Sequence, residues 1–124
     1  MKLIESINFV SFYEKIKEQK MPISLAYKLS KLYHKVKEDE TFYHTKLREI
    51  LYKYGELDEQ GNLIPIDDGK GIKIKPDQQI ACLTDINELQ DTISDIQFDP
   101  LALDELKDLE VTPSDIEGII EFIA

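Results

Sequence analysis

Apolar side chains recur in alternating three- and four-residue steps through residues 23–54, and this periodicity limits the fold more than any other feature of the chain. The positions are Ala26, Leu29, Tyr33, Val36, Tyr43, Leu47, Ile50 and Tyr54. Such a heptad-like seam predicts one helix of about 30 residues, roughly 45 Å long, packed on neighbouring elements. The acidic run at residues 38–41 interrupts the seam, because adjacent carboxylates repel one another. A continuous helix and a break capped by Asp39 or Thr41 both fit the sequence.

A shorter helix precedes this segment. Phe9, Phe12 and Ile16 have helical spacing, so we expect a helix over about residues 8–19. Residues 3–7 fit either a short strand or the beginning of that helix. Pro22 then suits the first turn of the long helix.

The middle of the chain has the pattern of a β-hairpin. Gly55 follows the long helix and is expected to cap it in the left-handed conformation. Two short apolar runs, residues 62–66 and 72–75, flank the turn signal Asp68-Gly69 and predict paired strands. Pro65 requires the first strand to be an edge or irregular.

Three helices are predicted toward the C-terminus. Residues 78–94 have helical spacing and would run antiparallel to the long helix. Asp99-Pro100 has the form of a helix start and predicts a short helix over about 101–108. Thr112-Pro113 followed by Asp115 is a start signature for a last helix. Its apolar face carries Ile116, Ile119, Ile120 and Ile123.

These elements predict an α+β fold that is mostly α-helical. It contains a long antiparallel helical hairpin, a small β-hairpin at the middle connection and short C-terminal helices. We expect a single domain over residues 1–124, with a basic helical part (8–54), the β-hairpin (55–76) and an acidic helical part (77–124).

Charge is distributed unevenly along the chain. Residues 1–53 carry 11 basic and 7 acidic side chains, a net charge of +4, whereas residues 54–124 carry 4 and 18, a net charge of −14. From Asp77 onward Lys107 is the only basic residue and faces 13 carboxylates. This excess must be solvated, matched by the basic N-terminal half, or presented to a positively charged partner.

Carboxylates at three- and four-residue steps predict an acidic stripe along the helix expected at 78–94 and just beyond it. Its members are Asp85, Glu88, Asp91, Asp95 and Asp99. The stripe is either the solvated face of an amphipathic helix or a contact surface for a basic protein, and the spacing is the same in both cases. These five residues are the candidate partner-binding site.

Lysines along the long helix, with nearby tyrosines, suggest contact with nucleic acid. The basic set is Lys28, Lys31, Lys35 and Lys37, beside Tyr27 and Tyr33. A net charge of −10 repels polyanions, however, so direct nucleic-acid binding is not expected. Solvation, or pairing with the acidic half, is the simpler role for these lysines.

Motifs for catalysis and metal binding are missing from the sequence. His34 and His44 lie ten residues apart with no metal-ligand spacing, and the series beginning at Asp58 lacks the glycine and glutamate of a calcium loop. The pair Gly69 and Gly71 lacks the rest of a phosphate loop, and no nucleophile has a base at motif spacing. We therefore expect that the protein is not an enzyme and that it binds neither a cofactor nor a metal ion.

The remaining signals concern the cell compartment. Cys82 is the only cysteine and sits between apolar neighbours, so we expect a small buried side chain in a reducing environment. No apolar run reaches the length of a membrane span, and residues 1–7 lack the pattern of a secretory signal. A cytoplasmic protein is expected.

Two stretches of the chain resemble a known group of proteins. One comprises residues 54–62 and 71–76, Tyr-Gly-Glu-Leu-Asp-Glu-Gln-Gly-Asn and Gly-Ile-Lys-Ile-Lys-Pro; the other is residues 109–116 with Phe122 and Ile123. Together they resemble small proteins of tailed phages and prophages of low-GC Gram-positive bacteria, over most of the chain from about Pro22. That group has no assigned activity and so no functional residues to carry over. The helix–hairpin–helix plan is also similar to β-type prefoldin subunits, at the level of fold alone.

The resemblance implies a phage protein acting in the bacterial host, and two classes of function then compete. One is an inhibitor that covers a host nucleic-acid-handling or defence protein, of the CRISPR type, with the acidic stripe. The other is an assembly or virion accessory protein that forms homo-oligomers or holds a partner through the helical seam. The seam residues are Tyr33, Val36, Tyr43, Leu47 and Ile50. The first class predicts binding that weakens steeply with salt, and the second predicts salt-tolerant association.

Overall fold

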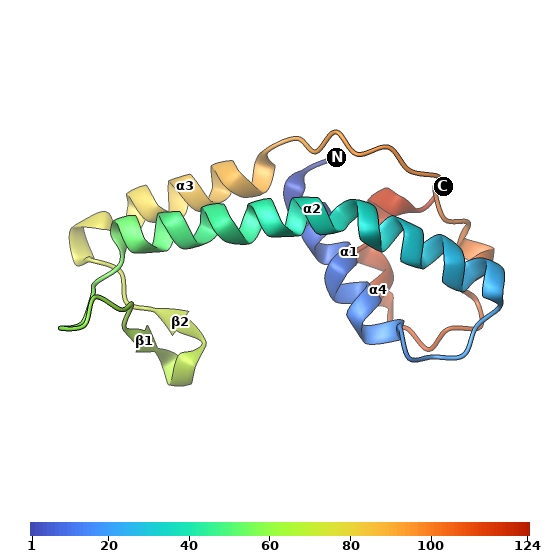
Figure 1. Ribbon diagram of the computed structural model, residues 1–124, viewed down its shortest axis with the longest axis horizontal. Coiled ribbons are helices and arrows are strands. Elements are labelled where there is room, and N and C mark those ends of the chain that lie inside the picture. The colour runs from blue at the N-terminus through green and yellow to red at the C-terminus, as the bar shows by residue number, and fades with distance from the viewer. The chain divides into compact units, whose positions relative to one another are not determined.

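The longest element, α2, runs without a break from Ile23 to Tyr54 in the computed structural model, which describes residues 1–124 (Figure 1). The acidic run does not interrupt it, because its side chains have partners. Lys37 Nζ lies 2.6 Å from Glu40 Oε1, and Asp39 Oδ2 accepts hydrogen bonds from other elements. The Thr41 hydroxyl donates to the Lys37 carbonyl within the helix. A helix break at this run is therefore wrong.

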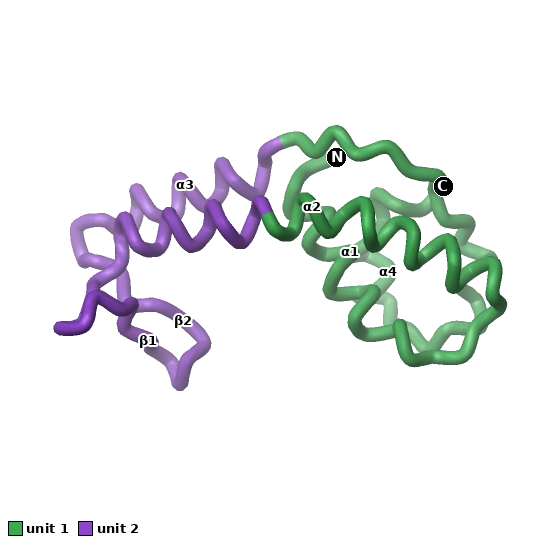
Figure 2. The backbone as a smooth tube through the Cα atoms, in the orientation of Figure 1, with its two compact units in different colours: residues 1–41, 93–124 green, residues 42–92 purple.

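The chain packs as two units (Figure 2). The first unit comprises residues 1–41 and 93–124, and the second comprises residues 42–92. Helix α2 contributes residues 23–41 to the first unit and residues 42–54 to the second.

In the first unit, helix α1 (Leu3–Ile16) packs antiparallel to the first part of α2. Ser6 bonds to Asp39 near one end of the pair, and the Tyr13 and Tyr33 rings stack 4.3 Å apart farther along it. Helix α1 begins at Leu3, so a strand over residues 3–7 is wrong. Its first turn is closed by the backbone N–H of Lys2, which donates to the Glu5 carboxylate at 2.8 Å.

The last part of the chain, residues 93–124, completes the first unit with short turns of helix. These are a 3-10 turn (Leu103–Leu106), α4 (Pro113–Glu117) and a second 3-10 turn (Ile120–Phe122). The helix start predicted at Thr112 is confirmed and is a capping box, because the Asp115 N–H donates to the Thr112 hydroxyl and the Thr112 N–H donates to the Asp115 carboxylate. The helix predicted at 101–108 is reduced to its 3-10 turn, whose N-terminal flank is Ala102 rather than Asp99.

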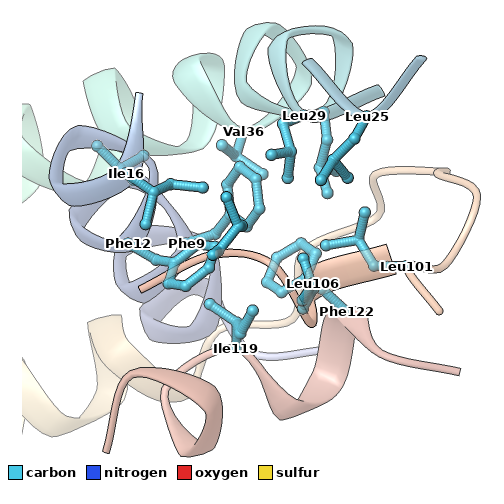
Figure 3. Close-up of a cluster of buried hydrophobic side chains, with 13 residues drawn as sticks. Phe9, Phe12, Ile16, Leu25, Leu29, Val36, Leu101, Leu106, Ile119 and Phe122 are labelled. Carbon is cyan, nitrogen blue, oxygen red and sulfur yellow. The ribbon is translucent and has the colours of Figure 1, made fainter. Parts of the chain in front are cut away.

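Side chains from three stretches of the chain form the core of the first unit (Figure 3). Helix α1 provides Phe9, Val10, Phe12 and Ile16; α2 provides Leu25, Leu29, Leu32 and Val36; the last part provides Leu101, Leu106, Leu109, Ile119 and Phe122. The Phe122 ring lies 4.9 Å from the rings of both Phe9 and Phe98. The last part of the chain is thus held by its own buried side chains.

In the second unit, α3 (Gln79–Asp91) runs antiparallel to residues 42–54 of α2. Gln90 donates to the Tyr43 hydroxyl at 3.3 Å, and the Tyr54 hydroxyl donates to Asp85 at 2.6 Å. The connection contains the predicted β-hairpin, with strands β1 (Pro65–Ile66) and β2 (Gly71–Ile72) joined by a 3-10 turn at Asp67–Gly69. Pro65 pairs with Ile72 and Ile66 with Gly71, so both strands are shorter than the sequence indicated.

Gly55 ends α2 for a reason that the sequence did not reveal. Its φ is not positive, so the predicted left-handed cap is wrong. Its backbone instead forms a bridge with Ile74, and a Cβ there would lie 2.5 Å from both the Leu51 carbonyl oxygen and Leu63 Cδ2. Glycine is required because the chain passes too close for a side chain.

Candidate functional site

The five carboxylates of the predicted stripe lie in two different settings. Asp85, Glu88 and Asp91 are on α3 of the second unit, whereas Asp95 and Asp99 are in the irregular stretch 93–100 of the first unit. Helix α3 ends at Asp91, short of the predicted residue 94. The helical spacing that related all five residues therefore applies only to the first three.

Asp85 is occupied by contacts within the second unit. Its carboxylate accepts the Tyr54 hydroxyl at 2.6 Å and lies 3.9 Å from Lys53 Nζ. Contact with the Tyr54 hydroxyl, and then the Asp85 charge, raises the pKa of Lys53. Burial raises the pKa of the neighbouring Cys82 thiol, and Asp85 raises it further. These contacts hold α3 against α2 and leave Asp85 little freedom to bind another molecule.

Glu88 and Asp91 are exposed on α3. Glu88 makes no ion pair, and it lines a shallow groove of about 340 Å³ between α2 and α3 in the second unit. Phe42 and Lys46 lie in the same lining, with Lys46 Nζ 3.3 Å from Glu49. Glu88 is therefore the α3 carboxylate best placed for contact with a partner.

The acidic segment, residues 93–124, carries nine carboxylates and a single lysine. The N-terminal lysines neutralise two of the nine. Lys15 Nζ lies 2.7 Å from Asp115 Oδ1, and Lys28 Nζ lies 3.0 Å from Glu105 Oε1. A third carboxylate, Asp104, lies 3.8 Å from Lys107. The basic N-terminal half therefore neutralises only part of the negative charge of the acidic segment.

The two matched carboxylates titrate below their usual range. The Lys15 ammonium, with the Thr112 N–H, lowers the pKa of Asp115. The Ala102 N–H, and after it Lys28, lowers the pKa of Glu105. Both groups hold the acidic segment on α1 and α2, so we assign them to the fold of the first unit.

Six carboxylates of the acidic segment are exposed and form no ion pair. They are Asp95, Asp99, Asp108, Glu110, Glu117 and Glu121. Their backbone is fastened by the core side chains and by a bridge between Leu101 and Ile123, with Leu101 N–H donating to the Phe122 carbonyl at 2.7 Å. The first unit therefore presents negative charge on a supported backbone.

The seam residues lie against other parts of the same chain. Tyr33 stacks on Tyr13 and Val36 is fully buried in the core of the first unit. In the second unit Tyr43 is buried, and Leu47 and Ile50 are half-buried. Most of the seam is thus used within the chain.

No group of three or more His, Cys, Asp or Glu side chains is arranged to hold a metal ion. His34 and His44 are both exposed on α2. The acids of the central loop form turns instead: Asp58 Oδ1 accepts the N–H groups of Gln60 and Asn62, each at 2.9 Å. None of the helices has the length and apolar composition needed to cross a bilayer.

Sequence reasoning missed two features of the first unit. Ser6 and Ser94 both donate to Asp39 Oδ2, at 2.8 and 2.6 Å, which ties α1 and the acidic segment to α2. The second feature is a groove beside the lysines of α2, whose other wall includes Phe98. No sequence signal marks either, because the partners are more than 30 residues apart in the chain.

Comparison with protein-family models, with curated proteins and with solved structures finds no match for this chain.

Proposed function

We propose that this protein is a non-catalytic binding module that presents its acidic segment to the basic surface of another protein. The observation that carries the proposal is the set of six exposed carboxylates that lack ion pairs, on a backbone anchored in the core of the first unit. An anchored array of like charge attracts a complementary surface with little ordering cost, and it accelerates encounter at low salt.

The geometry shifts the proposed contact away from part of the predicted stripe. Asp95 and Asp99 stay in it, whereas Asp85 is committed to Tyr54 and Glu88 belongs to the second unit. A surface of this charge suits a partner that ordinarily binds the phosphates of nucleic acid. If the phage resemblance holds, an inhibitor of a host nucleic-acid-handling or defence protein is the function we favour.

The burial of the seam favours this proposal over the alternative of assembly through the helical seam. Val36 and Tyr43 are buried within the chain and offer almost no surface to a second molecule. An assembly protein that used them would first have to open its own core, at a cost of several kcal/mol.

The test is a pull-down with tagged protein from host and infected-cell lysates, eluted in steps of rising salt and analysed by mass spectrometry. We expect release of one basic, nucleic-acid-handling protein, because the Debye length falls from about 8 Å at physiological salt to about 3 Å at 1 M. A double-stranded DNA fragment should displace the same protein. Retention above 1 M salt, or release of phage structural proteins alone, would contradict the proposal.

A matched pair of triple variants separates the acidic segment from charge in general. The test variant carries Asp108→Asn, Glu110→Gln and Glu117→Gln; the control carries Glu59→Gln, Asp68→Asn and Asp77→Asn in the second unit. All six side chains are exposed and none forms an ion pair, so the two variants have the same net charge and little effect on the fold. We expect the test variant alone to lose the partner. Equal retention by both variants would show that the acidic segment is not the contact.

A further inference from the structure

The first unit contains a groove along α2 that plays no part in the proposed function. Its volume is about 470 Å³, and its lining comes from α2 (Tyr27, Lys28, Lys31, Leu32 and Lys35) and from the acidic segment (Phe98 and Asp99). A second hollow of about 550 Å³ shares Lys31 and Lys35 and adds His34, Glu38, Ile96 and Gln97. The two hollows therefore follow one row of lysines.

Two of these lysines lack a carboxylate partner in a chain where carboxylates are in excess. Lys35 Nζ donates to the Gln97 carbonyl at 2.6 Å, and Lys31 Nζ lies 5.6 Å from the centre of the Tyr27 ring. Only Lys28 is paired, with Glu105. Asp99 is in the lining but forms no ion pair. The first hollow therefore holds three ammonium groups, one of them paired with Glu105, against the single carboxylate of Asp99, and the carboxylate of Glu38 lies in the lining of the second hollow.

Flat apolar surface lies next to these ammonium groups. The Tyr27 ring is 65% exposed, and the Phe98 ring is half-buried beside the core. Aromatic rings of this kind stack on the faces of bases, and ammonium groups bind phosphate. The volume falls within the range of small-molecule pockets, about 300–1,000 Å³.

We propose that this groove binds a nucleoside phosphate, with the base against Tyr27 and Phe98 and the phosphates at Lys31 and Lys35. A small anion senses mainly the charges within a Debye length of about 8 Å, whereas a long polyanion is also repelled by the net charge of −10. The groove can therefore bind a single nucleotide, although the net charge of the whole protein repels a nucleic-acid strand. This inference does not depend on the proposed function, but Asp99 belongs to both surfaces.

The test is titration of the isotopically labelled protein with ATP, followed by amide chemical shifts. We expect saturable shifts at residues 27–35 and 97–99, with a dissociation constant below about 1 mM. Lys31→Ala with Lys35→Ala should weaken binding about tenfold or more, which corresponds to about 1.4 kcal/mol or more. The matched control is Lys70→Ala with Lys75→Ala, two lysines of the second unit that also lack an ion pair. Its affinity for ATP should match that of the unchanged protein.

Two further comparisons test the ring and the charge separately. Tyr27→Ala should weaken ATP binding several-fold, whereas Tyr52→Ala, which removes an exposed tyrosine of the second unit, should not. Tripolyphosphate and adenosine should each bind more weakly than ATP. Tripolyphosphate keeps only the contacts with the lysines, and adenosine keeps only the contacts with the aromatic rings. The proposal is overturned if 5 mM ATP causes no saturable shift, if the Lys70 and Lys75 variant loses as much affinity, or if tripolyphosphate binds as tightly as ATP.

Discussion

The two units of this chain differ in how much apolar surface they bury. The first unit has a cluster of thirteen buried side chains drawn from α1, α2 and the acidic segment. In the second unit the buried apolar side chains are Tyr43, Tyr54, Cys82 and Leu89, while Ile80 and Leu83 of α3 are 85% and 59% exposed. One helix, α2, thus packs on α1 and the acidic segment in its first part and on α3 in its second. A regular seam indicates that a helix has neighbours, but not how many.

This difference implies unequal resistance to opening. Because stability rises with the apolar surface removed from water, the second unit should open locally at a lower free energy than the first. Native-state hydrogen exchange can measure both values in one sample, and the changes below alter one unit at a time.

The largest effect is expected from Phe122→Ala in the first unit. Phe122 is fully buried between Phe9 and Phe98, so its removal leaves a cavity and should lower the free energy of unfolding by about 3–5 kcal/mol. Urea unfolding followed by circular dichroism measures the loss. Ile120→Ala, two residues away and 58% exposed, should change it by less than about 1 kcal/mol. A similar loss for both variants would show that the core does not set the stability of the first unit.

Gly55→Ala should produce the largest effect in the second unit. The new methyl group would meet the Leu51 carbonyl and Leu63, and overpacking of this kind costs about 1–3 kcal/mol. Faster amide exchange in β1, β2 and α3, with exchange in α1 unchanged, would confirm that the change destabilises the second unit alone. Gly118→Ala is the control, because the nearest atoms there lie 3.6 Å from the added Cβ. Exchange unaltered by Gly55→Ala would mean that the chain is not closely packed at that point.

Asp39→Ala tests the polar contact that joins three parts of the first unit. The change leaves the fully buried Ser6 hydroxyl with only the weak acceptor Met1 Sδ, 4.0 Å away, and a poorly satisfied buried group costs about 1–3 kcal/mol. Ser94 loses the same acceptor, so exchange should rise in residues 93–97 as well as in α1. The exposed neighbour Glu38 provides the control, and Glu38→Ala should leave both regions unchanged.

Tyr54→Phe is the corresponding polar change in the second unit. It removes the hydrogen bond to Asp85 while keeping the ring, and because Asp85 is only half-buried we expect a loss of about 1 kcal/mol. Amide exchange in α3 reports the loss. Tyr52→Phe removes a hydroxyl that makes no hydrogen bond and should have no effect. If the two variants behave alike, the bond contributes nothing to holding α3.

The smallest effect is a dependence of the first unit on acid pH. The pKa values of Asp115 and Glu105 are lowered from their usual values of 3.8 and 4.5. Folding therefore gains stability from them above those values, and the gain disappears as the pH falls through the lower pKa values of the folded state. Unfolding measured between pH 6 and about pH 3 should show this loss, and Lys15→Met should reduce the part due to Asp115. Lys20→Met is the control, because Lys20 forms no ion pair.

Local features of the fold were predictable to different degrees. The bounds of α2, the box at Thr112 and the Asp-Gly hairpin follow from local periodicity and turn chemistry, which act over a few residues. The conformation of Gly55 and the partners of residues 38–41 were predicted wrongly or left open. In each case a segment distant in sequence decides the outcome: Ile74 and Leu63 at Gly55, and Ser6 and Ser94 at Asp39.

The candidate site shows the same division. The excess of carboxylates after Asp77 can be counted from the sequence, but their separation into anchored and exposed groups cannot. Asp85 and Glu88 have equivalent places in the pattern, yet only Asp85 meets Tyr54. The lysines of α2 were visible in the sequence, and the groove beside them was not, because Phe98 lies 63 residues beyond Lys35.

The sequence by itself determined the extent of α2, where the hairpin turns and how the charge divides between the two halves. These properties depend on backbone preferences and composition within one or two turns of chain. Only the tertiary structure decided that the first part of α2 belongs to a large buried core and the second part to a small one. It also decided which carboxylates of the acidic segment form ion pairs. Those outcomes depend on contacts between residues far apart in the chain, whose free energies arise only when the packed neighbours exclude water.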